Sequence, residues 1–365
     1  MIEKSSLFSP YKLGQIELKN RIVMAPMTRS RAIGNVPNDI MAKYYEQRAE
    51  AGLIITEGTS PSPNGLGYTR IPGIFSREQM EGWKKVTEAV KSKGGHIFVQ
   101  LMHSGRIGHP ANLHKTARLL APSAVKAKGK VHTDSLGLQE FPEPIAMSRE
   151  DIQSTKNEYV EAAKNAIEAG FDGVELHGAN GYLLEQFLSP FSNQRTDNYG
   201  GSIQNRCRFV LEVAEEAARV IGKSHLAIRL SPYGVSSDMA YYPEIDATYY
   251  YLAEQLNKIG LVYLHIVDHS SMGAPLVPLS IKQTIREKFK GTIILAGGFN
   301  RESAEAVIAS KLGDLVAFGK QFITNPDLVS RLENHLPINT DFDFKTFYTP
   351  GEAGYTDYPA YELVR

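Results

Sequence analysis

The segment DGVELHGANGY, residues 172–182, places His177, Asn180 and Tyr182 directly after an apolar stretch. The first two carry N–H donors, and their spacing lets them converge on one oxygen atom. Two donors polarise a carbonyl and stabilise the enolate that develops there. A tyrosine keeps its proton near neutral pH, because phenols have a pKa of about 10. It can therefore protonate a nearby carbon. This combination predicts reduction of a C=C bond conjugated to a carbonyl.

That reaction also needs a hydride, which a cofactor must supply because no side chain does. The triplet by itself has an alternative interpretation, since Asn180-Gly181 is an ordinary turn signal and a histidine at a strand end often serves only as a hydrogen-bonding group. The choice between a catalytic triplet and an ordinary turn therefore depends on the strands and helices that position the three residues.

Short apolar segments alternate with longer amphipathic ones along the chain. We expect strands at residues 21–28, 53–58, 96–103, 173–179, 226–232, 262–268, 292–298 and 315–320. Several are apolar almost throughout, which is typical of parallel strands covered on both faces. The alternation predicts a single-domain α/β fold over residues 1–365, a (β/α)8 TIM barrel. A doubly wound sheet has the same order of elements and remains the alternative.

Helical patterns fill the intervals between these strands. Residues 148–170 begin with a Ser-x-x-Asp capping pattern and end in glycine. The one long excursion, residues 104–147, follows the third strand and contains several prolines, which oppose regular structure. Because it leaves the C-terminal end of a strand, we expect it to form a lid or pocket wall within the barrel domain.

In TIM barrels the active site lies at the C-terminal ends of the strands. That rule gathers residues from distant parts of the chain into one predicted site. Besides the triplet, these strand ends carry Pro26, Met27, Thr28, Gly58, Gln100, His103 and Arg229. An arginine inside an apolar strand requires an anionic partner, because burying an unpaired guanidinium is costly.

The last two strands end in Ala296-Gly297-Gly298 and Phe318-Gly319-Lys320. Their backbone N–H groups and the lysine charge could bind one phosphate, as barrels often do after strands seven and eight. Tight turns are the alternative explanation for these glycines. The sequence has neither a G-x-G-x-x-G strand–helix junction nor a P-loop, so a phosphorylated cofactor or substrate would lie across the barrel mouth.

These residues belong to stretches that resemble the Old Yellow Enzyme family of FMN-dependent ene-reductases. The resemblance covers almost the whole chain, and its overall character is that of the bacterial nitroester, N-ethylmaleimide and enone reductases. The matching stretches are LFSPYKLGQIELKNRIVMAPMTRSRA, VQLMHSGR, IRLSP, FITNPDL, GYTDYP and, most specifically, GFDGVELHGANGYLLEQFLSPFSNQRTDNYGGSIQNRCRF.

The resemblance implies non-covalently bound FMN, with NADPH or NADH as reductant in a ping-pong scheme. It implies that His177 and Asn180 hold the activating oxygen of the substrate while flavin N5 delivers hydride and Tyr182 protonates the other carbon. It further implies that FMN is bound by Pro26, Met27, Thr28, Gly58, Gln100, Arg229 and the two glycine-containing segments at residues 296–298 and 318–320. Tyr68, Met102 and Tyr348 are expected to line the substrate pocket, and nitroesters and nitroaromatics to be further substrates.

Two positions depart from the family pattern. Lys320 stands where relatives usually have arginine, and lysine keeps the charge without the bidentate fork that suits phosphate. Met102 stands where many relatives have tryptophan, so a flexible thioether should reshape the pocket. Substrate preference therefore does not transfer directly from relatives, and we expect FMN to bind more weakly than it would beside arginine.

Composition limits the other functions that the protein could have. Forty basic residues balance forty acidic ones, so no nucleic-acid or anionic-membrane partner is expected. The single cysteine, Cys207, excludes an internal disulfide and a cysteine-held iron–sulfur cluster. The histidines show no metal-ligand spacing, so we expect no metal. With neither a signal peptide nor an apolar run of membrane length, we expect a cytoplasmic monomer or homodimer acting on small-molecule activated alkenes.

Three other classes of protein compete with this interpretation, and the sequence excludes the first of them. Dienoyl-CoA reductases use the same barrel, but the single cysteine and the end of this sequence at Arg365 do not fit their iron–sulfur cluster and added C-terminal portion. A barrel that binds FMN as a sensor without turnover would not need the intact triplet. A phosphate-binding isomerase or aldolase barrel would be colourless even after FMN is added.

Overall fold

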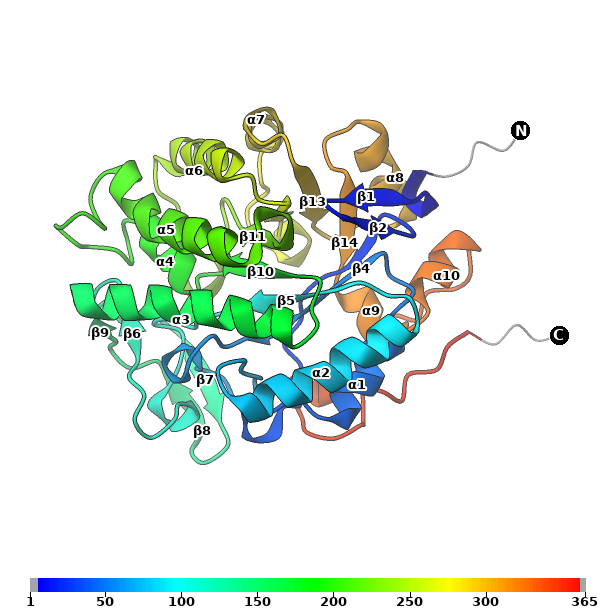
Figure 1. Ribbon diagram of the computed structural model, residues 1–365, viewed down its shortest axis with the longest axis horizontal. Helices are drawn as coiled ribbons and strands as arrows, with labels where there is room; N and C mark the ends of the chain where they lie inside the picture. Colours follow the sequence, from blue (N-terminus) through cyan, green and yellow to red (C-terminus); the bar gives the residue numbers. More distant parts are fainter. Residues whose placement is uncertain (1–5, 362–365) are drawn as a thin grey trace.

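The computed structural model describes residues 6–361, and within them eight parallel strands close into a barrel (Figure 1). The order around the barrel is β3, β4, β5, β10, β11, β12, β13 and β14, and β14 pairs with β3 to close it. The TIM-barrel prediction is confirmed, because a doubly wound sheet would leave two open edges. The strands are β3 (Ile22–Met24), β4 (Leu53–Thr59), β5 (Ile97–Leu101), β10 (Gly173–Gly178), β11 (Leu226–Leu230), β12 (Tyr263–Val267), β13 (Thr292–Ala296) and β14 (Leu315–Phe318).

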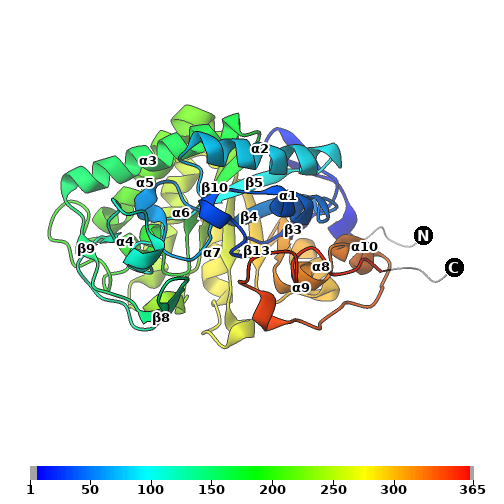
Figure 2. The same ribbon diagram turned by 90° about the horizontal axis from the view of Figure 1, so that it is seen from below.

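Helices surround the barrel on the outside, as both views show (Figures 1 and 2). The capping boxes at Ser76, Ser148 and Asn300 start three of them, and the Ser148 box was predicted from the sequence. The helices are α1 (Asp39–Glu46), α2 (Arg77–Ser92), α3 (Arg149–Glu168), α4 (Leu183–Leu188), α5 (Ile203–Ile221), α6 (Ile245–Ile259), α7 (Leu279–Lys288), α8 (Arg301–Ala309), α9 (Lys320–Thr324) and α10 (Leu328–Glu333). None within residues 6–361 is long and apolar enough to cross a bilayer.

A short hairpin that the sequence analysis did not identify closes the end of the barrel opposite the predicted site. It consists of β1 (Tyr11–Leu13) and β2 (Ile16–Leu18). Leu13 and Leu18 are buried in the same apolar cluster as Tyr263, at the N-terminal end of β12. The hairpin thus completes the core inside the barrel, while the larger apolar cluster lies between strands and helices.

The long excursion after β5 carries its own short strands. β6 (Leu120–Ala121) pairs with β9 (Ile145–Ala146), and β7 (Lys130–Thr133) forms an antiparallel hairpin with β8 (Gly137–Glu140). Figure 2 places β8 on the same side of the barrel as the C-terminal segment. The excursion therefore stands beside the barrel mouth.

Several strands end earlier than the sequence predicted, and the reason is local. β3 ends at Met24 rather than at residue 28. Ala25 still donates its N–H to Phe318 at 2.9 Å, but Pro26 has no N–H with which to continue the ladder. The predicted ends of strands seven and eight were also too late, because β13 stops at Ala296 and β14 at Phe318. The glycines that follow them therefore lie in loops at the mouth.

Candidate active site

Two adjoining cavities lie at the C-terminal ends of the barrel strands. The first has a volume of about 780 Å³ and the second about 520 Å³. Their walls have five residues in common, and the two cavities therefore meet along a shared boundary. These residues are Pro26, Thr28, Asn180, Arg229 and Tyr348.

With the exception of His103, every residue that the sequence analysis placed in the site lines one of the two cavities. The first cavity is also lined by Gly58, Tyr68, Gln100, Met102, His177 and Tyr182. The second is also lined by Met27, Ala296, Gly297, Gly298, Phe318, Gly319 and Lys320. His103 follows β5 but lines neither cavity; it is buried, and its Nδ1 accepts the N–H of Gly105 at 3.1 Å.

His177 lies in β10, and Asn180 and Tyr182 lie on the turn between β10 and α4. Asn180 has a φ of +59°, in the left-handed region that asparagine tolerates better than most residues. Its backbone N–H donates to Ser231 Oγ at 2.9 Å, and that hydroxyl donates to Glu185 Oε1 at 2.7 Å. Glu185 Oε2 accepts the N–H of Gly181 at 2.6 Å. The turn is thus anchored by a buried carboxyl group on α4 and a hydroxyl that follows β11.

Gly181 is required at this turn for two reasons. Its φ is +78°, and a Cβ built on it would lie 2.7 Å from Ser237 Cβ. Burial raises the pKa of Glu185 to about 7, although three hydrogen bonds, from Ser231, Gly181 and Tyr249, favour its ionised form. The turn is therefore held both by close packing around Gly181 and by hydrogen bonds to Glu185 and Ser231.

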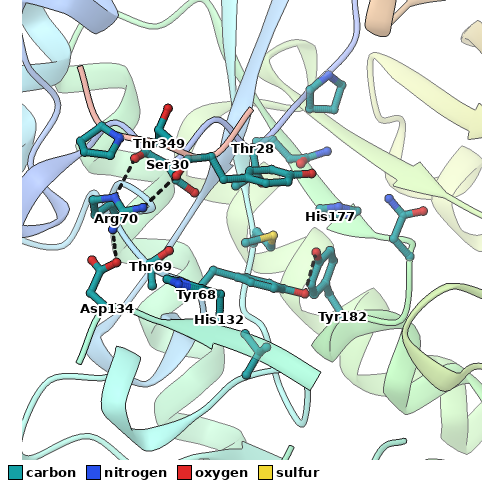
Figure 3. A pocket seen from close by; sticks show the side chains of 18 of the residues that line it. Thr28, Ser30, Tyr68, Thr69, Arg70, His132, Asp134, His177, Tyr182 and Thr349 are labelled. Carbon is teal, nitrogen blue, oxygen red and sulfur yellow. Dashed lines mark hydrogen bonds and ion pairs between the residues drawn. The ribbon is translucent and has the colours of Figure 1, made fainter. Parts of the chain in front are cut away.

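His177 and Tyr182 stand side by side in the first cavity (Figure 3). Their ring centroids are 4.8 Å apart and the planes meet at 69°. Burial, and then the charge of Arg229, hold the pKa of His177 well below its usual range, so the imidazole is neutral. Its buried Nδ1 has no hydrogen-bond partner within residues 6–361. A neutral imidazole offers one N–H donor, and His177 lines the first cavity, where a ligand can accept a hydrogen bond from it.

The hydroxyl group of Tyr182 donates a hydrogen bond to Tyr68 Oη at 3.2 Å (Figure 3). Burial raises the pKa of both phenols. Tyr182 therefore holds its proton until an acceptor forms beside it, and Tyr68 is the neighbour able to donate a hydrogen bond to the phenolate that proton transfer leaves.

Asn180 has a side-chain partner that the sequence analysis missed. The Nε2 atom of His269, just beyond β12, lies 2.7 Å from Asn180 Oδ1. His269 lines the second cavity. The available signal was the polar pair Asp268-His269 at the end of the sixth barrel strand, because the strand-end rule was applied to the other strands and not to this one.

The floor beneath the cavities is a buried polar cluster centred on Glu175, which the sequence analysis also missed. Glu175 accepts hydrogen bonds from Gln100 at 2.7 Å and Tyr263 at 3.0 Å, and it lies 2.9 Å from His265 Nδ1. Burial opposes its ionisation, but His265 and Arg229 more than offset this and lower its pKa. A carboxylate in the floor therefore faces the buried guanidinium of Arg229.

Arg229 lies opposite His177 in the register between β10 and β11. Its Nε has no hydrogen-bond partner within residues 6–361, although the residue is only 6% exposed. Burial lowers its pKa, whereas Glu175 acts in the opposite direction. A guanidinium remains charged under these conditions. A buried cation with an unused donor beside a cavity indicates an anionic or electron-rich ligand.

The rim of the first cavity is tied together by Arg70, a further residue that the sequence analysis missed. Arg70 donates to the carbonyl oxygens of Ser30 at 3.1 Å and Tyr348 at 2.8 Å, and it forms an ion pair with Asp134 (Figure 3). Asp134 lies in the turn of the β7–β8 hairpin, and Lys130, Val131 and His132 of that hairpin also line the cavity. The excursion therefore supplies part of the cavity wall.

A closed (β/α)8 barrel with the triplet and Arg229 at the C-terminal ends of its strands has its candidate site where TIM-barrel enzymes have their active sites. The family described as NADH:flavin oxidoreductase / NADH oxidase matches residues 6–339. The chain is 41% identical over 366 residues to 12-oxophytodienoate reductase 2 of Arabidopsis thaliana, covering 98% of this chain and 96% of the relative. It is 42% identical over 358 residues to a Leishmania infantum protein named "Probable flavin mononucleotide-dependent alkene reductase", covering 97% of each.

Solved structures agree with the sequence relatives. Morphinone reductase superposes with a TM-score of 0.94 at 42% identity, covering 98% of this chain and 97% of that one. A second structure of the same enzyme, in complex with tetrahydroNAD, gives a TM-score of 0.92 and covers 98% of both chains. The chain belongs to the Old Yellow Enzyme family of FMN-dependent flavoprotein oxidoreductases.

The residues of the second cavity fit the cofactor of this family. A Cβ on Gly319 would meet only Met27 Sδ at 3.8 Å and Ala25 Cβ at 4.0 Å, so its backbone borders open space. Lys320 is exposed at the start of α9, and both residues line the cavity. Arg229, whose Nε has no hydrogen-bond partner within residues 6–361, lines both cavities. One cation at each end suits a ligand with a phosphate and an electron-accepting ring.

Proposed function

We propose that the protein is an ene-reductase that uses FMN and NADPH or NADH to reduce the C=C bond of α,β-unsaturated carbonyl compounds. The observation that carries the proposal is the neutral His177 and protonated Tyr182 lining one cavity with Asn180. These groups can polarise a carbonyl and supply a proton, and such a reduction requires both functions of the protein.

Bound FMN would supply the hydride that it takes from the nicotinamide cofactor. The side chains of Thr28 and Gln100, with Pro26, Met27 and Gly58, would hold its ring, and Arg229 would balance the negative charge that the ring gains. The loops at residues 296–298 and 318–320, including Lys320, would bind its phosphate.

In this proposal, His177 and Asn180 donate hydrogen bonds to the oxygen of the substrate and orient its double bond. Tyr182 then transfers its hydroxyl proton to the α-carbon, and Tyr68 stabilises the phenolate that remains. Tyr68, Met102 and Tyr348 form the walls around the substrate. A nitro group presents oxygens to the same two donors, so we also propose nitroalkenes, nitroesters and nitroaromatics as substrates.

We further propose that the excursion at residues 104–147 belongs to the single barrel domain and acts as a wall of the substrate pocket. The proposal is supported by four residues of the β7–β8 hairpin that line the first cavity: Lys130, Val131, His132 and Asp134. Loops that vary around a fixed barrel are where enzymes of this architecture adjust substrate range.

An anaerobic absorption spectrum tests the proposed function. The purified protein should show the band of an oxidised flavin near ~450 nm. The band should bleach with NADPH or NADH and return when 2-cyclohexen-1-one is added. Bleaching without return would remove the alkene from the proposal and retain the flavin. A protein that remains colourless after reconstitution with FMN would contradict the proposal altogether.

A further inference from the structure

The amide of Asn180 is the part of the catalytic turn whose orientation the turn itself does not determine. The backbone is held through Ser231, but the side-chain amide can rotate by half a turn and exchange its donor and acceptor ends. Only the NH2 end can donate to a substrate oxygen, whereas the C=O end would repel it. Something must therefore select one of the two orientations.

His269 supplies that selection, because its Nε2 lies 2.7 Å from Asn180 Oδ1. When the imidazole carries its proton on Nε2, it donates to the amide oxygen, and the NH2 group must then lie on the other side. Asn180 borders both cavities, so the freed NH2 group is available to a ligand there. Burial, followed by the charge of Arg229, lowers the pKa of His269 to about 4, so the ring is neutral in ordinary buffers.

The loop that carries His269 is itself fixed at the residue before it. The Asp268 backbone N–H donates to Ala296 at 2.8 Å. Its carboxylate accepts one hydrogen bond from Nζ of Lys282, on α7, at 2.7 Å and another from the backbone N–H of Ser270 at 2.9 Å. Two neighbouring barrel strands and the helix between them therefore determine where the imidazole stands.

We propose that His269 is a positioning residue that holds the Asn180 amide with its NH2 group toward the oxygen of the substrate. The inference rests on the proposed function, because it assigns His269 a part in binding the activating carbonyl. In this arrangement β10 and the turn after it supply the two donors, and the loop after β12 sets the direction of one of them. Direct contact between His269 and a ligand is the competing explanation, since His269 also lines the second cavity.

A double-mutant cycle on the FMN-loaded protein separates the two explanations. The variants are His269→Phe, Asn180→Ala and the combination of both, with cyclohexanone as the ligand because it has a carbonyl but no C=C bond to reduce. Its Kd is measured from the change it causes in the flavin absorption band. We expect His269→Phe to weaken cyclohexanone binding by about 10-fold, the effect of one lost hydrogen bond. In the Asn180→Ala background the same substitution should have no further effect.

Further variants keep the test independent of folding. His269→Gln retains an N–H at a similar reach and should bind cyclohexanone nearly as the wild type does. His269→Leu is a second variant without a donor, in case the phenylalanine does not fit. His114→Phe, an exposed histidine outside both cavities, is the matched control and should change nothing. Bound FMN per chain and the melting temperature are recorded for each variant.

Two outcomes would overturn the inference. Unchanged cyclohexanone binding in His269→Phe and His269→Leu would show that the amide does not depend on the imidazole. Equal losses in the wild-type and Asn180→Ala backgrounds would show that His269 touches the ligand itself. Failure of the proposed function is seen separately, as a wild-type flavin that NADPH bleaches and 2-cyclohexen-1-one does not restore, while the binding cycle still reports on His269.

Discussion

The two ends of the barrel are built on opposite principles. At the N-terminal end, the β1–β2 hairpin fills the interior with Leu13 and Leu18, which are at most 1% exposed. At the C-terminal end, buried donors and acceptors such as Arg229 Nε and His177 Nδ1 have no partner within residues 6–361. Unsatisfied buried polar groups cost free energy. At the mouth, this cost indicates that the groups bind a ligand, whereas the packed residues of the closed end contribute to stability.

The strongest test of this contrast is Tyr182→Phe at the mouth. The substitution removes the proposed proton donor and leaves the ring packed against His177. The step in which the alkene restores the flavin band should slow by about 10²–10⁴-fold, the usual contribution of a general acid. Bleaching by NADPH should be unchanged, because it does not use that proton. Stopped-flow absorption measures the two steps separately. Unchanged alkene turnover would favour a barrel that binds FMN without catalysis of this kind.

The closed end should respond in the opposite way. Leu18→Ala leaves a hole in the packed interior and should lower the free energy of unfolding by about 2–5 kcal/mol. Chemical denaturation of the FMN-loaded protein measures this change. Catalytic rates should stay at the wild-type level in the folded variant. Glu17→Ala is the matched control, because the neighbouring side chain on β2 is exposed. A large loss of activity without a loss of stability would contradict the division between the two ends.

Tyr68→Phe sharpens the description of the mouth. It removes the hydroxyl that accepts from Tyr182 at 3.2 Å and that could stabilise the phenolate. The alkene-dependent step should slow by about 10-fold, the effect of one hydrogen bond to a charged group. The same stopped-flow experiment gives the rate, and the NADPH-dependent step serves as its internal control. If both steps slow equally, Tyr68 acts by shaping the cavity for both substrates.

The smallest expected effect concerns the exposed rim of the second cavity. Lys320→Arg restores a bidentate group for phosphate and should tighten FMN binding by about 3-fold, because exposed ion pairs contribute little. Quenching of FMN fluorescence on titration with apoprotein measures the Kd. Equal affinities of the wild type and the variant would show that lysine suffices at this position.

The sequence predicted the barrel and the contiguous part of the site because both depend on local patterns. His177, Asn180 and Tyr182 share one turn, so their proximity follows from chain connectivity. The strand-end rule then brought in residues such as Arg229 and Gly319. Several strand ends were placed too late, because the predicted ranges ran through Pro26, which has no N–H to continue the ladder, and through the loop glycines.

The residues that were missed act through partners that are distant in the chain. Glu175 lies between apolar residues of β10 and is explained by partners on other strands, such as His265, 90 positions away. His269 meets Asn180 across 89 positions, and Arg70 meets Tyr348 across 278. The β1–β2 hairpin consists of two three-residue strands, too short to leave a periodic signal. Such pairings depend on the closed barrel and cannot be read from one segment.

The three bonds of Arg70 have a consequence for engineering the pocket. One guanidinium joins the loop after β3, the tip of the β7–β8 hairpin and the C-terminal segment. A hairpin transplanted from a relative without an acid at position 134 would leave that cation short of a partner and loosen two segments that were not exchanged. The transferable unit is therefore the hairpin together with Arg70 and the segment around Tyr348, and grafts should be designed in these terms.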